Sequence, residues 1–138
     1  MTRTLVVDTS VLFAALDAND NAHHRCAALL ASDAVATVPA PVVGEVDWLA
    51  RTRGVPKAMW HLLRDILGGS VLVANLDHED YERALQLIVQ YGDMPLSLAD
   101  ASVIAIAERL EQDTIATLDR RHFSVVRPSH IEAFTLVP

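Results

Sequence analysis

Thr4-Leu-Val-Val-Asp8, near the start of the chain, indicates the fold class. Its three aliphatic residues follow one another without polar alternation, which is typical of a strand buried on both faces of a parallel sheet. Similar short runs occur later in the chain, at residues 36–38, 70–73, 114–117 and 133–137. We therefore expect about five strands in one central, mainly parallel sheet.

Helical patterns separate these runs. The expected helices cover residues 22–31, 41–53, 56–67, 77–91 and 97–110. Pro41 occupies a favourable first-turn position, and Gly68-Gly69 is a stop signal for the third of these helices. Asp77 and Ser97 are suited to cap the last two. Strands that alternate with helices predict a single α/β domain over residues 1–138, with helices on both faces of the sheet.

Length and composition agree with one folded domain. The chain has 138 residues, of which 51% are hydrophobic and 21% charged, so intrinsic disorder is excluded. Its single cysteine, Cys26, excludes an intrachain disulfide scaffold and fits a reducing compartment. Asp8 interrupts the apolar stretch that resembles a signal peptide, and no apolar run reaches the ~20 residues of a membrane span. We expect a cytoplasmic protein without a membrane segment.

Two carboxylates directly follow predicted strands. Asp8 comes after residues 5–7, and Asp119 comes after residues 115–118. In open α/β sheets, ligands bind in the crevice at the carboxyl ends of the strands, so both side chains are expected at that edge. Asp8 has a second interpretation as the N-cap of the helix that follows, a role that Ser10 could fill equally well.

Asp100 and Glu45 lie near the starts of predicted helices. Asp100 could form a capping box with Ser97, with its charge in the positive first turn. Residues 101–107 are apolar nearly all round, however, so this helix should be buried and its acid should face a cleft. Glu45 interrupts a helical stripe that is otherwise apolar, and a favourable interaction with the helix dipole is its alternative role.

Together, these four carboxylates are expected at one edge of the sheet. Converging carboxylates repel one another unless a cation lies between them, and their hard oxygen atoms suit Mg²⁺ or Mn²⁺. Such ions bind phosphate oxygens and lower the pKa of a bound water molecule. The pattern therefore predicts hydrolysis of phosphodiester bonds without a serine or histidine nucleophile.

The segments around these acids resemble the PIN-domain ribonucleases, and more narrowly the VapC-type toxins of bacterial toxin–antitoxin pairs. The resemblance rests on Leu5-Val-Val-Asp8-Thr-Ser-Val-Leu12, on Glu45 in its helix, on Leu98-Ala-Asp100-Ala-Ser-Val-Ile-Ala105 and on Ala116-Thr-Leu-Asp119-Arg-Arg-His-Phe123. It covers essentially the whole chain, in the same order and at the same spacings.

The resemblance implies a Mg²⁺- or Mn²⁺-dependent endoribonuclease whose acidic pocket lies at a parallel sheet. Asp8, Glu45, Asp100 and Asp119 match the family's four acidic positions. Asp8 and Asp100 would be the main metal ligands, and the other two would complete the pocket directly or through water. The implied substrate is RNA, usually a structured tRNA or rRNA site. The implied partners are a second copy, in a homodimer, and a small antitoxin that inserts a segment, often carrying an arginine, into the pocket.

The basic residues are nearly all arginines, which bind phosphate in a bidentate manner. Arg120 and Arg121 directly follow Asp119 and are candidates for binding the RNA, with ordinary surface positions as the alternative. Arg51 and Arg53 end a predicted helix, where they would interact with the helix dipole.

The net charge of −7 argues at first against binding to nucleic acid, because nucleic-acid-binding domains are usually basic. Four of the 18 acids belong to the predicted pocket, which leaves 14 acids against 11 bases elsewhere. Two divalent cations would neutralise the pocket. The acidity is therefore compatible with an RNA substrate that is attracted by metal and by a few arginines.

Two further groups of residues carry weaker signals. The His-His-x-Cys pattern at residues 23–26 suggests zinc, but adjacent histidines on a helix point about 100° apart and nothing nearby completes four ligands. We interpret it as a polar helix start. Trp48 and Trp60, with Met59, could form part of a dimer or antitoxin surface, and we expect at least one of them to pack in the core.

Alternative functions are left open by the sequence. A PIN-type nuclease outside a toxin–antitoxin pair would use the same residues. A phosphatase with an Asp-x-Asp nucleophile is disfavoured because Ser10 stands at the second Asp position. A receiver domain needs a lysine near its acidic pocket, and the only lysine, Lys57, lies in a predicted helix. A non-catalytic interaction domain is disfavoured by the intact set of acids.

Overall fold

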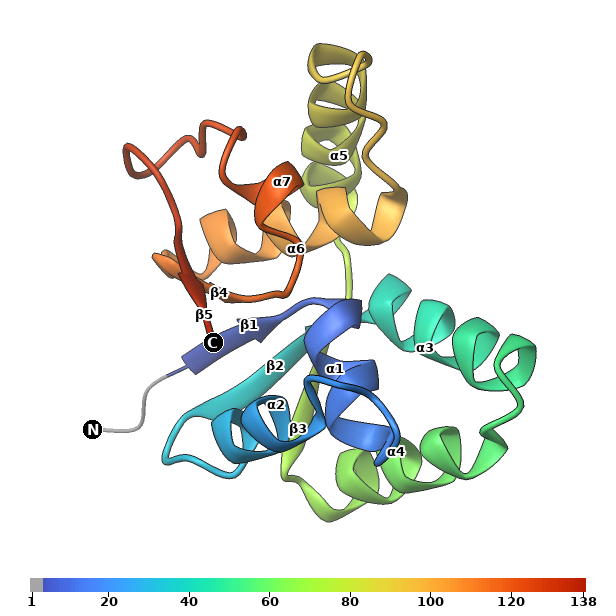
Figure 1. Cartoon of the computed structure of the whole chain (residues 1–138). Coiled ribbons are helices and arrows are strands. Elements are labelled where there is room, and N and C mark those ends of the chain that lie inside the picture. Colours follow the sequence, from blue (N-terminus) through green and yellow to red (C-terminus); the bar gives the residue numbers. More distant parts are fainter. Residues whose placement is uncertain (1–3) are drawn as a thin grey trace.

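The computed structural model describes residues 4–138 (Figure 1). The strands in this part of the chain are β1 (Thr4–Val7), β2 (Val35–Pro39), β3 (Val71–Ala74), β4 (Thr114–Ala116) and β5 (Thr135–Val137). The helices are α1 (Thr9–Leu16), α2 (His23–Leu30), α3 (Ala40–Thr52), α4 (Pro56–Gly68), α5 (His78–Gln90), α6 (Leu98–Arg109) and α7 (Arg120–Phe123). None of the helices in residues 4–138 is long and apolar enough to cross a membrane.

The strands form one sheet in the order β3-β2-β1-β4-β5, and every pairing is parallel. In the central strand β1, Val6 pairs with Thr37 of β2 on one side and with Ile115 of β4 on the other. The strand order reverses between β1 and β4, which is where open α/β sheets form a binding crevice. The predicted parallel sheet is confirmed. Its last strand is shorter than predicted, because only residues 135–137 pair with the short strand β4.

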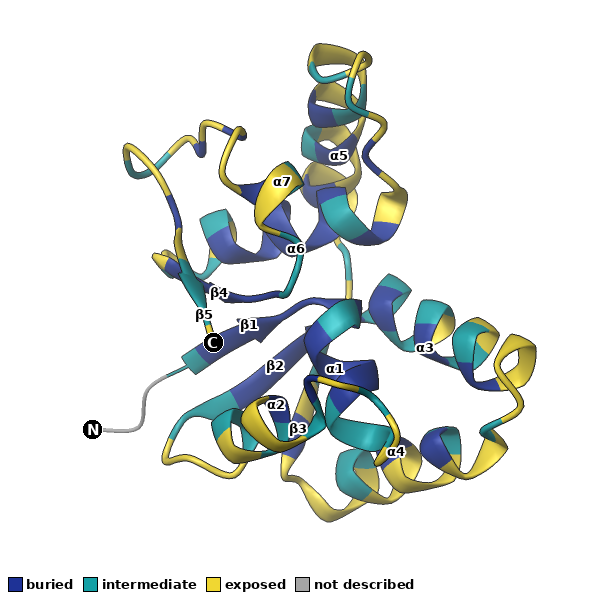
Figure 2. Ribbon diagram, viewed as in Figure 1, coloured by how far each residue is buried: buried dark blue, intermediate teal, exposed yellow. Residues whose placement is uncertain are grey.

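Helices cover both faces of the sheet, as predicted. α6 packs against β1, β2 and β4 on one face with α5 beside it, whereas α1 lies on the other face with α2 and α4 (Figure 1). The centre of the sheet and most of α6 are buried, and the outer helices expose one side (Figure 2). Fully buried side chains such as Val6, Ile104 and Ile115 each stabilise the fold by roughly 1.5–3 kcal/mol.

The predicted helix caps are present. The Asp77 side chain accepts a hydrogen bond from the Asp80 backbone at 2.9 Å, and the Asp80 side chain accepts one from the Asp77 backbone at 3.0 Å. α6 begins with the same reciprocal arrangement between Ser97 and Asp100. α4 ends at the predicted glycines, because Gly69 has a φ of 85°, a left-handed conformation that glycine adopts without strain.

Ion pairs join α5 to α6. Arg83 donates two hydrogen bonds to the Glu108 carboxylate, at 2.7 and 2.9 Å, and the Glu108 side chain is 8% exposed. Nearer the start of α5, Arg109 of α6 contacts Asp80 at 3.1 Å. α5 therefore holds α6, the helix that presents Asp100, in a fixed position on the sheet.

Trp48 and Trp60 lie on the surface, with 56% and 54% of their area exposed. Of the three residues considered for the core, Met59 alone packs against it. The reason is helical spacing. The buried positions of α3 are residues 42, 46 and 50, and those of α4 are residues 58 and 62. Each tryptophan lies two residues from its buried neighbours, on the opposite side of its helix.

Candidate active site

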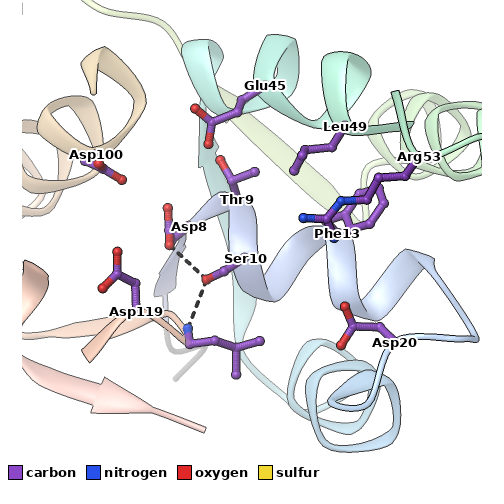
Figure 3. Close-up of a pocket in the computed structure, with 11 residues that line it drawn as sticks. Asp8, Thr9, Ser10, Phe13, Asp20, Glu45, Leu49, Arg53, Asp100 and Asp119 are labelled. Atoms are coloured by element: carbon purple, nitrogen blue, oxygen red, sulfur yellow. Dashed lines mark hydrogen bonds between the residues drawn. The ribbon is translucent and has the colours of Figure 1, made fainter. Parts of the chain in front are cut away.

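The four predicted acids line one cavity of about 260 Å³ at the carboxyl edge of the sheet (Figure 3). Asp8 follows β1, Asp119 follows β4, Asp100 lies in the first turn of α6, and Glu45 lies on α3. Their carboxylates point toward a shared space from four different elements (Figure 3). The fold thus brings together acids that are far apart in the chain.

Asp8 is the most buried of these acids, with 3% of its area exposed. Its Oδ2 accepts hydrogen bonds from Thr117 Oγ1 at 2.8 Å and from Ser10 Oγ at 2.9 Å. Burial raises the pKa of Asp8 to about 6, and the negative charge of Asp100 adds to the rise, whereas the two hydroxyls lower it. A carboxylate in this environment is stabilised when it binds a proton or a cation.

The two hydroxyls also tie Asp8 to the segment that carries Asp119. Ser10 Oγ accepts a hydrogen bond from the Leu118 backbone at 2.9 Å, and Thr117 Oγ1 accepts one from the Asp119 backbone at 2.9 Å. Asp8 stands at the N-cap position of α1, but its side chain makes no capping bond. Its carboxylate is therefore held toward the cavity rather than used to start the helix.

Asp100 serves its helix and the cavity together. Its Oδ2 accepts a hydrogen bond from the Ser97 backbone at 3.1 Å, and its own backbone N–H donates to Ser97 Oγ at 3.0 Å. The capping box orients the carboxylate toward the cavity, so both sequence interpretations hold. Glu45 lies between the buried residues Val42 and Val46 and lines the same cavity.

Asp119 is held by His122. Its Oδ1 accepts a hydrogen bond from the His122 backbone at 3.0 Å, and its Oδ2 lies 2.5 Å from His122 Nδ1. Asp119 thereby caps α7, a short helix that the sequence patterns did not predict. The signal was present as Asp-x-x-His, because a residue three positions after an N-cap lies next to the capping carboxylate.

Arg120 and Arg121, the predicted RNA-binding residues, are not among the described residues that line the cavity. Arg120 Nη2 donates to the carbonyl oxygen of Pro138 at 2.9 Å and lies 3.5 Å from that of Leu136. This side chain turns toward the end of the chain, and Arg121 is exposed on α7. A role of either residue in RNA binding stays a prediction.

The donor set fits a hard divalent cation, since the four acids offer carboxylate oxygens. Thr9 Oγ1 is buried beside this cavity without a hydrogen-bond partner within residues 4–138, and Thr9 lies between Asp8 and Glu45 (Figure 3). No three His, Cys, Asp or Glu side chains of the described chain are close enough together to enclose an ion. The cavity therefore fits a cation that keeps several water molecules, as Mg²⁺ usually does.

Two comparisons with known proteins decide the family. The PIN-domain family profile matches residues 5–127. Ribonuclease VapC26 of Mycobacterium tuberculosis is 38% identical over 135 residues, which cover 97% of this chain and 100% of the relative. This chain belongs to the VapC ribonucleases of the PIN-domain family.

Solved VapC and toxin–antitoxin structures share its fold. VapC20 of Mycobacterium tuberculosis, described as a toxin that cleaves the sarcin–ricin loop, has a TM-score of 0.80 and 24% identity, over 93% of this chain and 98% of its own. A toxin–antitoxin complex from Klebsiella pneumoniae contains a chain with a TM-score of 0.64 and 20% identity, over 88% of this chain and 92% of its own. At these identities the likeness concerns the fold.

The cavity of this VapC chain extends beyond the acids, to residues that the sequence patterns did not assign to a site. Phe13, Leu49, Arg53 and Asp20 line its other end (Figure 3). Arg53 was expected to interact with the dipole of its helix, but its guanidinium lies over the Phe13 ring, 5.1 Å from the ring centroid. Helical spacing could have identified Phe13, because it lies one turn after Thr9 on α1.

Proposed function

We propose that this protein is a divalent-metal-dependent endoribonuclease that acts as the toxin of a toxin–antitoxin pair. The observation that carries the proposal is the buried Asp8 carboxylate, which has a pKa of about 6 and lines one cavity with Glu45, Asp100 and Asp119. A buried acid that makes no ion pair with a basic side chain of residues 4–138 is suited to bind a cation. Membership of the VapC ribonucleases supports RNA as the substrate.

Asp8 and Asp100 would hold the metal, which we propose to be Mg²⁺ or Mn²⁺. Glu45 and Asp119 would complete the site directly or through water. When bound, the cation would supply positive charge to the phosphate oxygens and lower the pKa of a water molecule. Oxygen-only donors are the type that these two ions prefer.

The chain itself contributes positioning. Ser10 and Thr117 hold Oδ2 of Asp8, and His122 holds Asp119 through both carboxylate oxygens. The Thr9 hydroxyl, which has no partner within the described residues, is available to a water molecule beside the acids. These contacts restrict the rotamers of the acids, so little rearrangement would be needed when RNA arrives.

Cleavage of RNA by purified protein tests the proposal. With Mg²⁺ or Mn²⁺ the wild type should cleave RNA, and EDTA should stop cleavage. Asp8→Asn and Asp100→Asn should stay folded by circular dichroism and lose activity by about 100-fold or more. Asp33→Asn, which changes an exposed acid outside the cavity, serves as the matched control and should retain full activity. Undiminished cleavage by Asp8→Asn, or in EDTA, would contradict the metal site.

The RNA target is proposed to be a structured site in tRNA or rRNA. Total tRNA, ribosomal RNA and a sarcin–ricin loop fragment are suitable first substrates, the last because VapC20 is described as cleaving that loop. Mapping of cleaved 5′ ends after brief expression identifies the site in cells. Ends spread without preference over unstructured RNA would contradict a structured target.

We also propose a small antitoxin as partner, whose inserted segment places a basic side chain among the acids. A toxin–antitoxin complex with the same fold supports this partner. Expression of the chain alone should arrest growth, and co-expression of the small neighbouring reading frame should relieve the arrest. Unimpaired growth with active protein present would contradict the toxin role and leave the nuclease role standing.

A homodimer is the proposed assembly, acting in the cytoplasm where its RNA would be found. Two groups of exposed apolar side chains offer contact surfaces. They are Trp48, Trp60, Leu63 and Leu67 on α3 and α4, and Tyr81, Leu85 and Val89 on α5. Light scattering should give twice the chain mass of 15.1 kDa. A monomer at micromolar concentration would contradict the dimer.

A further inference from the structure

We propose that Arg53 and Lys57 bind the RNA backbone beside the bond that is cut, through its phosphates. Arg53 directly follows α3 and lines the acidic cavity, and Lys57 lies in the first turn of α4 and lines the neighbouring cavity. The inference rests on the proposed function, because it assigns part of the substrate to this end of the same cavity. It also separates two tasks, with the acids holding the cation that would meet the reacting phosphate and the turn holding the adjacent strand.

The segment around the α3–α4 turn, residues 51–64, is positively charged, whereas the whole chain is negatively charged. Residues 51–64 contain four arginine or lysine side chains and no acid, in a chain whose net charge is −7. The four are Arg51, Arg53, Lys57 and Arg64. A basic segment that borders the cavity supplies positive potential for a polyanion that approaches it, because Lys and Arg neutralise backbone phosphates.

Arg53 is presented to the cavity by Phe13. Its guanidinium lies over the ring, 5.1 Å from the centroid, so the aromatic face supports one side of the group while its edges stay exposed. Within residues 4–138, Arg53 makes no ion pair, whereas Arg51 contacts Asp47 at 3.3 Å. A planar guanidinium without an anionic partner, at the edge of a site, is suited to a phosphate.

Two acids, one in each of the cavities that border the turn, are engaged by their own loop. Asp20 lines the same cavity as Arg53, and its Oδ1 accepts a hydrogen bond from the Ala22 backbone at 2.8 Å. Asp17 Oδ1 accepts one from the Asn19 backbone at 3.1 Å. These bonds to their own loop fix both acids, and neither pairs with Arg53 in the described chain. Arg53 is therefore available to an external anion.

Positions along α1 give the approximate distance between the acids and the Arg53 site. Phe13 follows Asp8 by five residues, which is about 7.5 Å along a helix axis. A stacked strand advances about 3.4 Å per nucleotide, so Arg53 would meet a phosphate about two nucleotides from the reacting one. Beyond the turn, a second cavity of about 370 Å³ is lined by Gly54, Lys57 and His61. The strand can therefore continue over α4 past Lys57.

RNA binding by three glutamine variants tests the proposal. Arg53→Gln and Lys57→Gln remove the proposed contacts. Arg51→Gln is the matched control, because Arg51 ends the same helix, is exposed, and does not line either cavity in the described chain. The probe is a fluorescein-labelled 12-nucleotide single-stranded RNA of mixed sequence, followed by anisotropy between 25 and 150 mM salt in EDTA. Electrophoresis of the RNA afterwards checks that it stays intact.

We expect Arg53→Gln to bind about tenfold more weakly than the wild type, and Lys57→Gln several-fold more weakly. Each should lower the slope of log K against log salt by about 0.7, the value for one lost phosphate on a single strand. Arg53→Lys keeps the charge and should keep the slope, with intermediate affinity because the stacked guanidinium is lost. In Mg²⁺, Arg53→Gln should raise KM more than it lowers kcat.

The outcomes separate this inference from the proposed function. Equal binding by Arg53→Gln, Arg51→Gln and the wild type overturns the inference, and cleavage by the wild type in Mg²⁺ would still support the nuclease. A slope that depends on Arg53 in a protein that never cleaves RNA supports the phosphate contact and overturns the nuclease. A wild type that binds no RNA in EDTA overturns the inference, and the nuclease is then decided by cleavage in Mg²⁺. Thermal melting shows whether each variant is folded.

Discussion

Replacing Asp8 by asparagine should make the metal-free protein more stable above pH 6. The ordinary pKa of this carboxyl is 3.8, and in the fold it is about 6. Between these values the folded protein binds more protons than the unfolded chain, so the free energy of unfolding falls as pH rises through the window. A difference of about two pKa units corresponds to about 3 kcal/mol above pH 6.

Asparagine removes the charge while its Oδ1 still accepts the hydrogen bonds of Ser10 and Thr117. At pH 7.5 in EDTA, Asp8→Asn should therefore melt about 10 °C above the wild type. The advantage should fall to about half at pH 5 and to about a fifth at pH 4, where the folded carboxyl is protonated and the unfolded one is still partly ionised. Asp33→Asn, on an exposed loop, should change stability by less than about 0.5 kcal/mol at each pH.

Calorimetric melting of the three proteins at pH 4, 5 and 7.5 provides the measurement. Equal or lower melting of Asp8→Asn at pH 7.5 would refute the reasoning that burial of this charge opposes folding. A stabilisation of the same size at every pH would also refute it, because the gain must follow the titration of Asp8. The expected result would show that stability is sacrificed to keep an ionised acid in the cavity.

Three further predictions concern neighbouring contacts. Thr117→Val removes a hydrogen bond that lowers the pKa of Asp8, so the acidic limb of the pH–activity profile should move to higher pH. An unchanged limb would show that Asp8 is not the group whose ionisation sets it. Arg83→Ala leaves Glu108 buried without its ion pair and should lower the free energy of unfolding in urea by about 2–3 kcal/mol. A change near zero would show that the ion pair does not stabilise the fold. Mg²⁺ binding should release about half a proton per ion at pH 6 and almost none at pH 7.5, where Asp8 is already ionised. Calorimetry of Mg²⁺ binding in two buffers measures this release. Equal release at both pH values would exclude Asp8 as the group coupled to the metal.

The elements that could be predicted are those whose signals are local. The apolar run at residues 4–7 identified a buried strand, and the capping pairs of Asp77 and Ser97 located the starts of α5 and α6. α7 escaped prediction because a helix of four residues has no periodicity to detect. The exposure of Trp48 could have been predicted from its spacing relative to residues 46 and 50, but its size and apolar character favoured the core.

Some residues of the cavity could be predicted from local signals in the same way, and others could not. Acids that follow strands or begin helices could be assigned to one edge of the sheet, because strand ends and helix starts meet there in any open α/β fold. The partners of those acids depend on packing between distant segments. Thr117 reaches Asp8 across the β1–β4 pairing, and Arg53 reaches Phe13 across the α1–α3 contact. Neither contact can be predicted from a local sequence pattern.

The position of β4 beside β1 determines when the cavity can form during synthesis of the chain. β4 inserts next to β1 although it is far later in the sequence, and it brings Thr117 and Asp119 to Asp8. A ribosome-bound chain that lacks residues after 113 has no strand to pair with that side of β1, and so no complete cavity. Contacts this distant in sequence also form slowly, because a long loop must be closed first. The acids of the cavity would therefore come together only after the segment around Asp119 has emerged and paired, long after β1 and Asp8 have been made.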